Sequence, residues 1–231
     1  MSIYKHYSFD LWMTLIKSNP VFKSERAKLF HKNFNAGKKS LEEVTAIFRQ
    51  VDLMCNAINE KTGKNIDADE MNLMVIAMMN DFSAAFADVD LDELYTDTEK
   101  LLFNYMPMVY SDETITALNS LKQNNTSFNI ASNTAFIKGC SLKRVLAHLE
   151  LESFFDFQLY SDEIGVSKPN KEFFELVLNQ VNNIYLKNQI SLKDIVHIGD
   201  NPKADIEGAQ SVGINSILIN SNSTTILSLL N

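Results

Sequence analysis

The feature that most constrains the fold is an alternation of short apolar runs with longer stretches of helical spacing. The apolar runs are rich in β-branched and aromatic residues, which favours strands. The expected strands are Tyr7–Phe9, Ser127–Ala131, Phe157–Tyr160, Asp194–Ile198 and Asn215–Ile219, and the expected helices between them are Ser141–Leu149, Lys171–Asn183 and Ala204–Val212. Repeated βα units predict an α/β fold with a Rossmann-like, doubly wound parallel sheet.

A block without strand signals interrupts this alternation after the first strand. Between residues 19 and 106 the only glycines are Gly37 and Gly63, and Ser40 stands three positions before Glu43, the spacing of a helix capping box. The expected helices of the block are Val21–Phe34, Ser40–Lys61, Asp67–Phe86 and Asp90–Tyr105. We therefore predict an α/β core made of residues 1–18 and 107–231, and an inserted all-helical cap domain of residues 19–106 above the strand ends.

Composition restricts the partners and the compartment. With 29 acidic and 21 basic residues, the formal net charge of −8 argues against binding to nucleic acid or to an acidic membrane. The two cysteines, Cys55 and Cys140, suggest neither a disulfide framework nor a zinc site, and we expect both to be buried and reduced. The longest strongly apolar stretch, Leu73–Met79, is too short to span a membrane, and the first residues do not resemble a secretion signal. We expect a cytoplasmic protein that is a monomer or a homodimer.

Polar residues follow four of the predicted strands, where each strand ends. They are Asp10 and Thr14, then Ser132 and Asn133, then Lys168 before a proline, and finally Asp200 and Asp205. The carboxyl ends of parallel strands meet at one edge of a sheet, where α/β proteins bind ligands. Hydroxyl, amide and ammonium donors at this edge are suited to an anion.

The acidic residues of this group point to a metal ion. Asp200 and Asp205 would repel Asp10 at the same edge unless a cation joined them, and short acidic side chains suit Mg²⁺. Gly199 allows close backbone approach at this point. Each residue alone is more often a helix cap or a solvated side chain, but their order along the chain favours a single site.

The segments "SDEIGVSKPNKEFFELVL" and "HIGDNPKADIEGAQSVG", together with "FDLWMT" and "NIASNT", resemble the haloacid dehalogenase-like hydrolase superfamily, in its phosphatase branch. The resemblance implies a Mg²⁺-dependent hydrolase acting on a small phosphomonoester through an aspartyl-phosphate on Asp10. It implies that Lys168 and Ser132 bind and neutralise the phosphoryl group. Thr14 and Asn133 would support them. Mg²⁺ would be held by Asp10, Asp200 and the main-chain carbonyl of Trp12, with Asp205 as a ligand or as a residue that orients one.

The chain departs from the phosphatase pattern at two positions. Trp12 and Met13 stand where that branch has Asp and Gly. The missing Asp is the general acid and base of the family, and such a group contributes roughly 10²–10⁴-fold to a rate. We expect the Trp12 side chain to fill space between sheet and cap, to stack on the substrate, or to do both.

Two other functions fit this departure. The dehalogenase branch of the same superfamily has an aromatic residue at the position of Trp12, but it lacks the acidic pair and uses no metal. It also needs a cap arginine for the substrate carboxylate, and we expect the two candidates, Arg26 and Arg49, to be solvated. The other alternative is a catalytically impaired module that binds a phosphorylated ligand.

Overall fold

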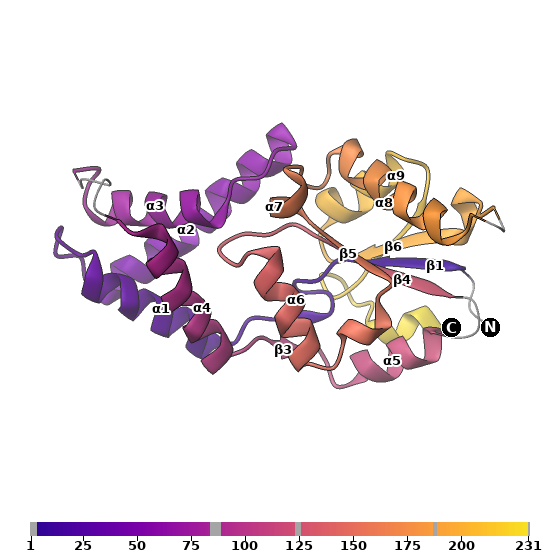
Figure 1. The fold of residues 1–231 in the computed structure, drawn as a ribbon, viewed down its shortest axis with the longest axis horizontal. Coiled ribbons are helices and arrows are strands. Elements are labelled where there is room, and N and C mark those ends of the chain that lie inside the picture. Colours follow the sequence, from indigo (N-terminus) through magenta and orange to yellow (C-terminus); the bar gives the residue numbers. More distant parts are fainter. Residues whose placement is uncertain (1–3, 84–88, 123–125, 187–188, 231) are drawn as a thin grey trace.

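The computed structural model describes residues 4–83, 89–122, 126–186 and 189–230, and its centre is a five-stranded parallel sheet. The strand order is β5-β4-β1-β6-β7 (Figure 1). The strands are β1 (His6–Phe9), β4 (Ser127–Ser132), β5 (Phe157–Tyr160), β6 (Ile195–Gly199) and β7 (Asn215–Leu218). This sheet confirms the predicted α/β class and all five expected strands.

β1 is the central strand, and the chain leaves it on both sides. His6 is in register with Ser127 of β4 on one side and with Ile195 of β6 on the other. The chain first builds β4 and β5 on one side and then β6 and β7 on the other. The strand order therefore reverses at β1, and ligand crevices in open sheets form beyond the carboxyl ends of the strands at such a point.

Helices cover both faces of the sheet because side chains alternate along each strand. Tyr7 and Phe9 of β1 pack into a cluster with α5 and α6, whereas Ile195 of β6 packs with α8 on the opposite face. The helices of the core are α5 (Glu113–Leu121), α6 (Gly139–His148), α7 (Ser161–Ile164), α8 (Lys171–Ile184) and α9 (Gly208–Gln210), with short 3₁₀ turns at Glu152–Phe154, Leu192–Asp194 and Ile226–Leu230.

Four consecutive helices, here called the cap helices, lie together at one end of the molecule (Figure 1). They are α1 (Pro20–Asn33), α2 (Leu41–Thr62), α3 (Ala68–Met79) and α4 (Leu91–Asn104). The short antiparallel strands β2 (Ile16–Lys17) and β3 (Met108–Val109) connect them to the core. Their apolar cluster includes Phe136, which follows β4, so the cap helices pack against the core. The exact division at residues 18 and 106 stays a prediction.

The end of α3 differs from the sequence expectation. The helix stops at Met79, and Asn80 then ties three segments together: its amide donates to the carbonyls of Phe34 and Ile76 (both 2.8 Å), and its Oδ1 accepts from the Gly37 N–H (2.7 Å). This cap ends the helix although the apolar spacing continues. Residues 84–86 of the expected helix lie outside the described residues.

Three further expectations need correction. The expected helix Ala204–Val212 is a π-helix over Pro202–Glu207 followed by the single turn α9, and α5 was not among the expected helices. Cys55 is buried, but Cys140, in the first turn of α6, is exposed.

The capping box of Ser40 and Glu43 is confirmed at the start of α2.

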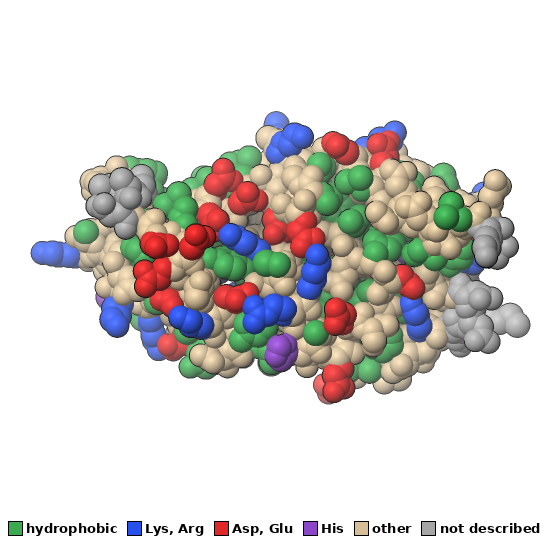
Figure 2. All heavy atoms as spheres, viewed as in Figure 1, with side chains coloured by type: hydrophobic (Ala, Val, Ile, Leu, Met, Phe, Trp, Pro, Cys, Tyr) green, Lys and Arg blue, Asp and Glu red, His purple; other side chains and the backbone are tan. Residues whose placement is uncertain are grey.

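The surface agrees with a mixed, mildly acidic composition. Figure 2 shows acidic and basic side chains interspersed over the cap helices and the junction with the core. Within the described residues, no helix combines the length and the apolar character that a membrane crossing requires.

Candidate active site

Asp10 directly follows β1, so its side chain stands at the carboxyl edge of the sheet. Its backbone N–H donates to the Ile198 carbonyl of β6 (2.8 Å). The Thr14 hydroxyl donates to Asp10 Oδ2 (2.9 Å), and Lys168 Nζ donates to Oδ1 (2.8 Å). Both carboxylate oxygens are thus held, and the side chain has a fixed orientation although it is 7% exposed to the cavity side.

Lys168 is fully buried and joins two carboxylates. Its Nζ also donates to Asp205 Oδ1 (2.6 Å). Burial opposes the positive charge, but Asp10 and Asp205 together raise the pKa of Lys168 above its usual range, so it is a cation at neutral pH. Asn133 positions its backbone: the Asn133 amide donates to the Lys168 carbonyl (2.9 Å), and the Lys168 N–H donates to Asn133 Oδ1 (2.8 Å).

Asp205 is held by two further groups, His197 and the backbone of Asn201. His197 Nε2 lies 3.1 Å from Asp205 Oδ1, and the other ring nitrogen lies 3.0 Å from the Ser8 hydroxyl. The Asn201 N–H donates to Asp205 Oδ2 (3.0 Å). Burial raises the pKa of Asp205, but Lys168 and His197 outweigh it and hold the pKa below the usual range. Asp205 is therefore ionised.

Three carboxylates converge and fit a divalent cation. Asp10, Asp200 and Asp205 each offer an oxygen within 4.8 Å of the others. Burial, and after it the charges of Asp205 and Asp200, raise the pKa of Asp10 to about 7 against the opposing charge of Lys168. Burial and Asp205 likewise raise the pKa of Asp200 to about 6. Lys168 alone leaves negative charge in the cluster, and hard carboxylate oxygens at this spacing suit Mg²⁺.

Gly199 is required by this close packing. A Cβ at this position would lie 2.2 Å from the carboxyl group of Asp205, far inside contact distance. The last residue of β6 must therefore be glycine for the π-helix that follows to bring Asp205 under the strand ends.

Two of the predicted residues do not line the cavity. Ser132 is fully buried at the end of β4 and donates to the Asn133 carbonyl (3.1 Å). Thr14 is also buried and reaches the site through Asp10. Thr134, the next residue of the "NIASNT" segment, lines the cavity beside Asn133. Phosphoryl binding by Ser132 stays a prediction.

Trp12 packs against the sheet as the first interpretation expects, and stacking on a substrate stays a prediction. Its side chain is half-buried, packs against the apolar cluster of the sheet and lines the cavity. The next residue, Met13, has φ +60°, a left-handed conformation that favours glycine. Met13 therefore holds a backbone conformation that glycine would adopt at lower cost. Whether the Trp12 carbonyl holds a metal stays a prediction.

A cavity of about 720 Å³ lies between the strand ends and the cap helices. Asp10, Lys168, Asp200 and Asp205 form its core side. The cap side comes from α1 and α2, and its residues are Phe22, Lys23, Arg26, Ala27, Thr45, Phe48, Arg49, Asp52, Asn56 and Glu60. The cavity is therefore formed jointly by the α/β core and the inserted helices.

Arg26 corrects one expectation. It is 7% exposed, not solvated, whereas Arg49 is exposed as expected. The helical spacing of α1 alone does not predict that Arg26 is buried, because one of the rings that cover Arg26 belongs to Phe136, more than a hundred residues along the chain.

A family model for haloacid dehalogenase-like hydrolases matches residues 7–219, nearly the whole chain. The chain belongs to the haloacid dehalogenase-like hydrolase family. The fold and the four strand-end segments that the sequence indicated agree with this membership.

Two curated relatives match part of this hydrolase. A pyrimidine 5'-nucleotidase of Escherichia coli is 26% identical over 106 residues, which is 46% of this chain and 43% of the relative. A glyceraldehyde 3-phosphate phosphatase of Methanothermobacter thermautotrophicus is 33% identical over 111 residues, or 48% of this chain and 45% of the relative. The matched parts thus span less than half the length of each relative.

Solved structures share the fold over almost the full chain. A hydrolase of this family from Bacillus subtilis, described as bound to magnesium, has a TM-score of 0.71 at 18% identity, covering 96% of this chain and 91% of that one. A 2-haloacid dehalogenase from Pseudomonas syringae has a TM-score of 0.63 at 17% identity, covering 96% and 89%. At these identities the likeness shows the fold alone.

Proposed function

We propose that this hydrolase is a Mg²⁺-dependent phosphatase that acts on a small phosphomonoester, with Asp10 as the nucleophile. The observation that carries the proposal is the arrangement of charges at the strand ends: Lys168 joins Asp10 to Asp205, and Asp200 completes a group of three carboxylates within 4.8 Å. Such a site supplies a nucleophile, a fixed cation and a place for a metal.

The proposed reaction has two steps on Asp10. A carboxylate oxygen of Asp10 attacks phosphorus while the bond from phosphorus to the leaving oxygen breaks, which gives an aspartyl-phosphate and a phenolate, or an alkoxide that takes a proton from solvent water. Water then attacks the same phosphorus and gives up a proton to solvent while the bond from phosphorus to the Asp10 oxygen breaks, which releases phosphate and restores the Asp10 carboxylate. Lys168 stabilises charge on the phosphoryl oxygens, and Thr14 keeps the carboxylate oriented.

Mg²⁺, when bound by Asp10, Asp200 and Asp205, would neutralise charge on the phosphoryl group and relieve the repulsion among the three carboxylates. Asn133 would keep Lys168 in position, since its side-chain amide and carbonyl hold the backbone of Lys168. The cap helices would exclude water from the cavity, which makes a carboxylate a better nucleophile.

The relatives support the same substrate class. Both curated matches are named for phosphomonoester hydrolysis, one on pyrimidine 5'-nucleotides and one on glyceraldehyde 3-phosphate. We extend only the shared chemistry to this chain. A cytoplasmic location and a monomeric or homodimeric state remain part of the proposal.

Dehalogenation is a second candidate because of Trp12. The indole lines the cavity beside Asp10 and provides no acid for an alkoxide leaving group, whereas halide leaves without a proton. In that reaction Asp10 would attack carbon in place of phosphorus. A module that binds a phosphorylated ligand without turnover is the remaining alternative.

One paired assay separates the three functions. The purified protein is incubated with p-nitrophenyl phosphate, with Mg²⁺ or with EDTA, and in parallel with 2-chloropropionate. We expect Mg²⁺-dependent release of nitrophenolate and no chloride. Metal-independent chloride release would establish the dehalogenase, and binding of phosphate and Mg²⁺ without turnover would establish the non-catalytic module.

A further inference from the structure

Asn220, shortly after β7, holds the turn that follows Asp10. Its side-chain Nδ2 donates to the backbone carbonyls of Met13 (2.9 Å) and Thr14 (3.2 Å). Both partners are carbonyl oxygens, so the amide nitrogen of Asn220 must be the atom that faces them. Within the described residues, no other group donates to either carbonyl. The turn is therefore held by a side chain from the other end of the sequence.

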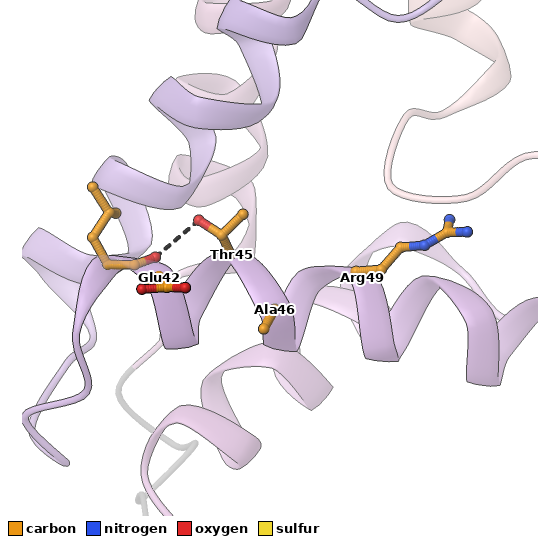
Figure 3. A pocket seen from close by; sticks show the side chains of 5 residues that line it. Glu42, Thr45, Ala46 and Arg49 are labelled. Atoms are coloured by element: carbon orange, nitrogen blue, oxygen red, sulfur yellow. Dashed lines mark hydrogen bonds between the residues drawn. The ribbon is translucent and has the colours of Figure 1, made fainter.

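A side chain that donates to a backbone carbonyl is not unusual by itself. Figure 3 marks such a bond within α2, where the Thr45 hydroxyl donates to the Leu41 carbonyl (2.8 Å). That bond joins residues four positions apart in one helix, so it reinforces a single helical turn. The Asn220 bonds instead span 207 and 206 residues and join the loops that follow β1 and β7. They fix the position of one loop relative to the other.

The backbone of Asn220 is itself fixed. Its N–H donates to the Thr224 carbonyl (2.9 Å), and the Ile219 N–H donates to the Gly199 carbonyl at the end of β6 (2.9 Å). Ile219 is fully buried in the same apolar cluster as Leu15. Asn220 has φ +64°, a left-handed conformation in which asparagine is enriched. Glycine adopts this conformation at lower cost but has no amide to donate.

Met13 is the residue that most needs this support. Its φ of +60° is left-handed, a conformation that a residue with a Cβ populates roughly fivefold to thirtyfold less than the right-handed one. Packing gives little help, because Met13 is 48% exposed. Two hydrogen bonds between neutral groups contribute a comparable factor, so the Asn220 amide offsets the cost. The next residue, Thr14, orients Asp10, since its hydroxyl donates to Asp10 Oδ2 (2.9 Å).

We propose that Asn220 is a positioning residue for phosphoryl transfer, because it holds Met13 and Thr14 in the conformation that orients Asp10. This inference rests on the proposed phosphatase function. Asn220 lies outside the set of residues that line the cavity, so it acts through the turn and not on the substrate. Since Asn220 offsets the strain of a methionine at position 13, its effect depends on which residue stands there.

The test removes the amide without straining the backbone. Asn220→Gly accepts φ +64° but has no donor. Asn222→Gly is the matched control, because Asn222 lies in the same loop but donates to the Leu218 carbonyl of β7 (3.0 Å). Both changes are made in the wild type and in Met13→Gly. Release of nitrophenolate from p-nitrophenyl phosphate is followed with Mg²⁺ and enzyme in excess, which separates the rate of phosphoryl transfer from substrate binding.

We expect Asn220→Gly to lower the rate of phosphoryl transfer about tenfold, on the order expected when one or two neutral hydrogen bonds are lost. The half-saturating enzyme concentration should change less than about twofold, because Asn220 makes no contact with the substrate. In the Met13→Gly background the same change should cost at most about threefold, since glycine adopts the left-handed conformation without support. Asn222→Gly should leave the rate unchanged in both backgrounds.

Trp12, the only tryptophan of the chain, reports the turn independently of activity. It precedes Met13 and is half-buried, so a looser turn exposes its indole to acrylamide. We expect stronger quenching of its fluorescence in Asn220→Gly and unchanged quenching in Asn222→Gly. Asn220→Asp provides a second variant if Asn220→Gly does not fold. Its carboxylate has nearly the same shape but only accepts hydrogen bonds, so it should cause the same two changes.

An unchanged transfer rate in Asn220→Gly, or an equal loss in Asn222→Gly, would overturn the inference. A loss of the same size with methionine and with glycine at position 13 would also overturn it. The proposed function stands in each of these cases if the wild type releases nitrophenolate. A wild type without turnover would contradict the proposed function, and the quenching of Trp12 would still decide whether Asn220 holds the turn.

Discussion

Trp12 and Met13 are the two residues at which this chain departs most from a phosphatase. The indole packs on the sheet cluster and lines the cavity, and the Met13 backbone keeps φ +60°. An indole N–H is a donor but not an acid at neutral pH. In the proposed reaction, residue 12 therefore supplies no proton to the leaving group.

Restoring the acid at this position tests the interpretation. We predict that Trp12→Asp with Met13→Gly raises kcat/KM for glycerol 2-phosphate at least about a hundredfold, the lower end of the 10²–10⁴-fold range of general acid catalysis. Activity on p-nitrophenyl phosphate, whose leaving group needs no proton, should change much less. Met13→Gly alone is the control for the backbone change. No gain in a folded double variant would mean that another group already supplies the proton.

Asp10 should be indispensable for turnover. Asp10→Asn removes the attacking oxygen but keeps the shape of the side chain, so we expect at least about a thousandfold loss of phosphatase activity, on the order expected for a covalent nucleophile. Asp112→Asn, at an exposed helix end, is the matched control and should leave activity unchanged. Circular dichroism of both variants checks the fold. Turnover by a pure Asp10→Asn protein would refute the assignment.

The sequence identified the residues at the strand ends but not all of their contacts. The four charged residues of the site converge because each lies shortly after an apolar strand. Asp10 and Asp200 follow their strands directly, Lys168 lies beyond the short helix α7, and Asp205 lies within the π-helix after β6. Burial of Arg26 was not predictable from α1, since it depends on rings from α2 and from the loop after β4. The Asn133 bonds to Lys168 likewise join segments that only the folded sheet brings together.

At the scale of elements, the end of α2 and the loop of Lys168 support each other. Gly63 ends α2 with φ +70°, and its carbonyl accepts from the Ser167 N–H (3.1 Å) and the Asn170 amide (3.3 Å). These bonds hold the cap helices against the residues on both sides of Lys168. A shift of the cap helices would therefore also move the loop that carries Lys168.

Two glycines allow this contact to be tested. Gly63 and Gly165 both have φ +70°, but a Cβ at Gly63 would lie 2.4 Å from Asn170 Nδ2, whereas nothing lies within 4 Å of one at Gly165. Gly165→Ala should cost only the left-handed backbone term, roughly 1–2 kcal/mol. Gly63→Ala should cost about 1–3 kcal/mol more because of the overlap, and should also lower kcat/KM. Chemical unfolding and activity of both variants measure this, and equal losses would contradict it.

Element boundaries were predictable where local chemistry sets them. The capping box starts α2 as expected, and the five strand positions of the parallel sheet follow directly from short apolar runs. The end of α3 depends on hydrogen bonds from Asn80 to Phe34 and Gly37, which lie in the connection between α1 and α2. The apolar spacing of α3 does not contain these bonds, so it predicts a longer helix than the structure has. In the π-helix over Pro202–Glu207, Asp205 packs directly against Gly199 of β6. The spacing of apolar residues carries no information on this contact, so it predicts an ordinary helix here.

At the scale of the whole molecule, His6 makes stability depend on pH away from the active site. It is fully buried at the start of β1, with ring nitrogens 2.6 Å from Ser127 Oγ and 2.7 Å from Asn129 Oδ1. Burial lowers the pKa of His6 from 6.5 to about 4. Between these values the unfolded chain binds the proton more readily, so the stability contributed by neutral His6 is present above pH 6.5 and is lost as the pH falls.

We predict that His6 alone lowers the free energy of unfolding by about 2 kcal/mol between pH 7 and pH 5. Urea unfolding of the wild type and of His6→Gln at both pH values measures the difference between the two slopes. The variant should be less stable at pH 7 and lose less on acidification. Parallel losses in both proteins would show that His6 is not the group responsible.

We propose that the phosphoryl group of the substrate is transferred to the Asp10 carboxylate. The most direct measurement is a rapid-quench reaction of the wild type with p-nitrophenyl phosphate and Mg²⁺, followed by borohydride reduction and peptide mass spectrometry. We expect homoserine, the product of reducing an aspartyl-phosphate, at position 10, and no homoserine with EDTA or in Asp10→Asn. Turnover without any adduct at Asp10, or an adduct on another residue, would contradict the proposed transfer.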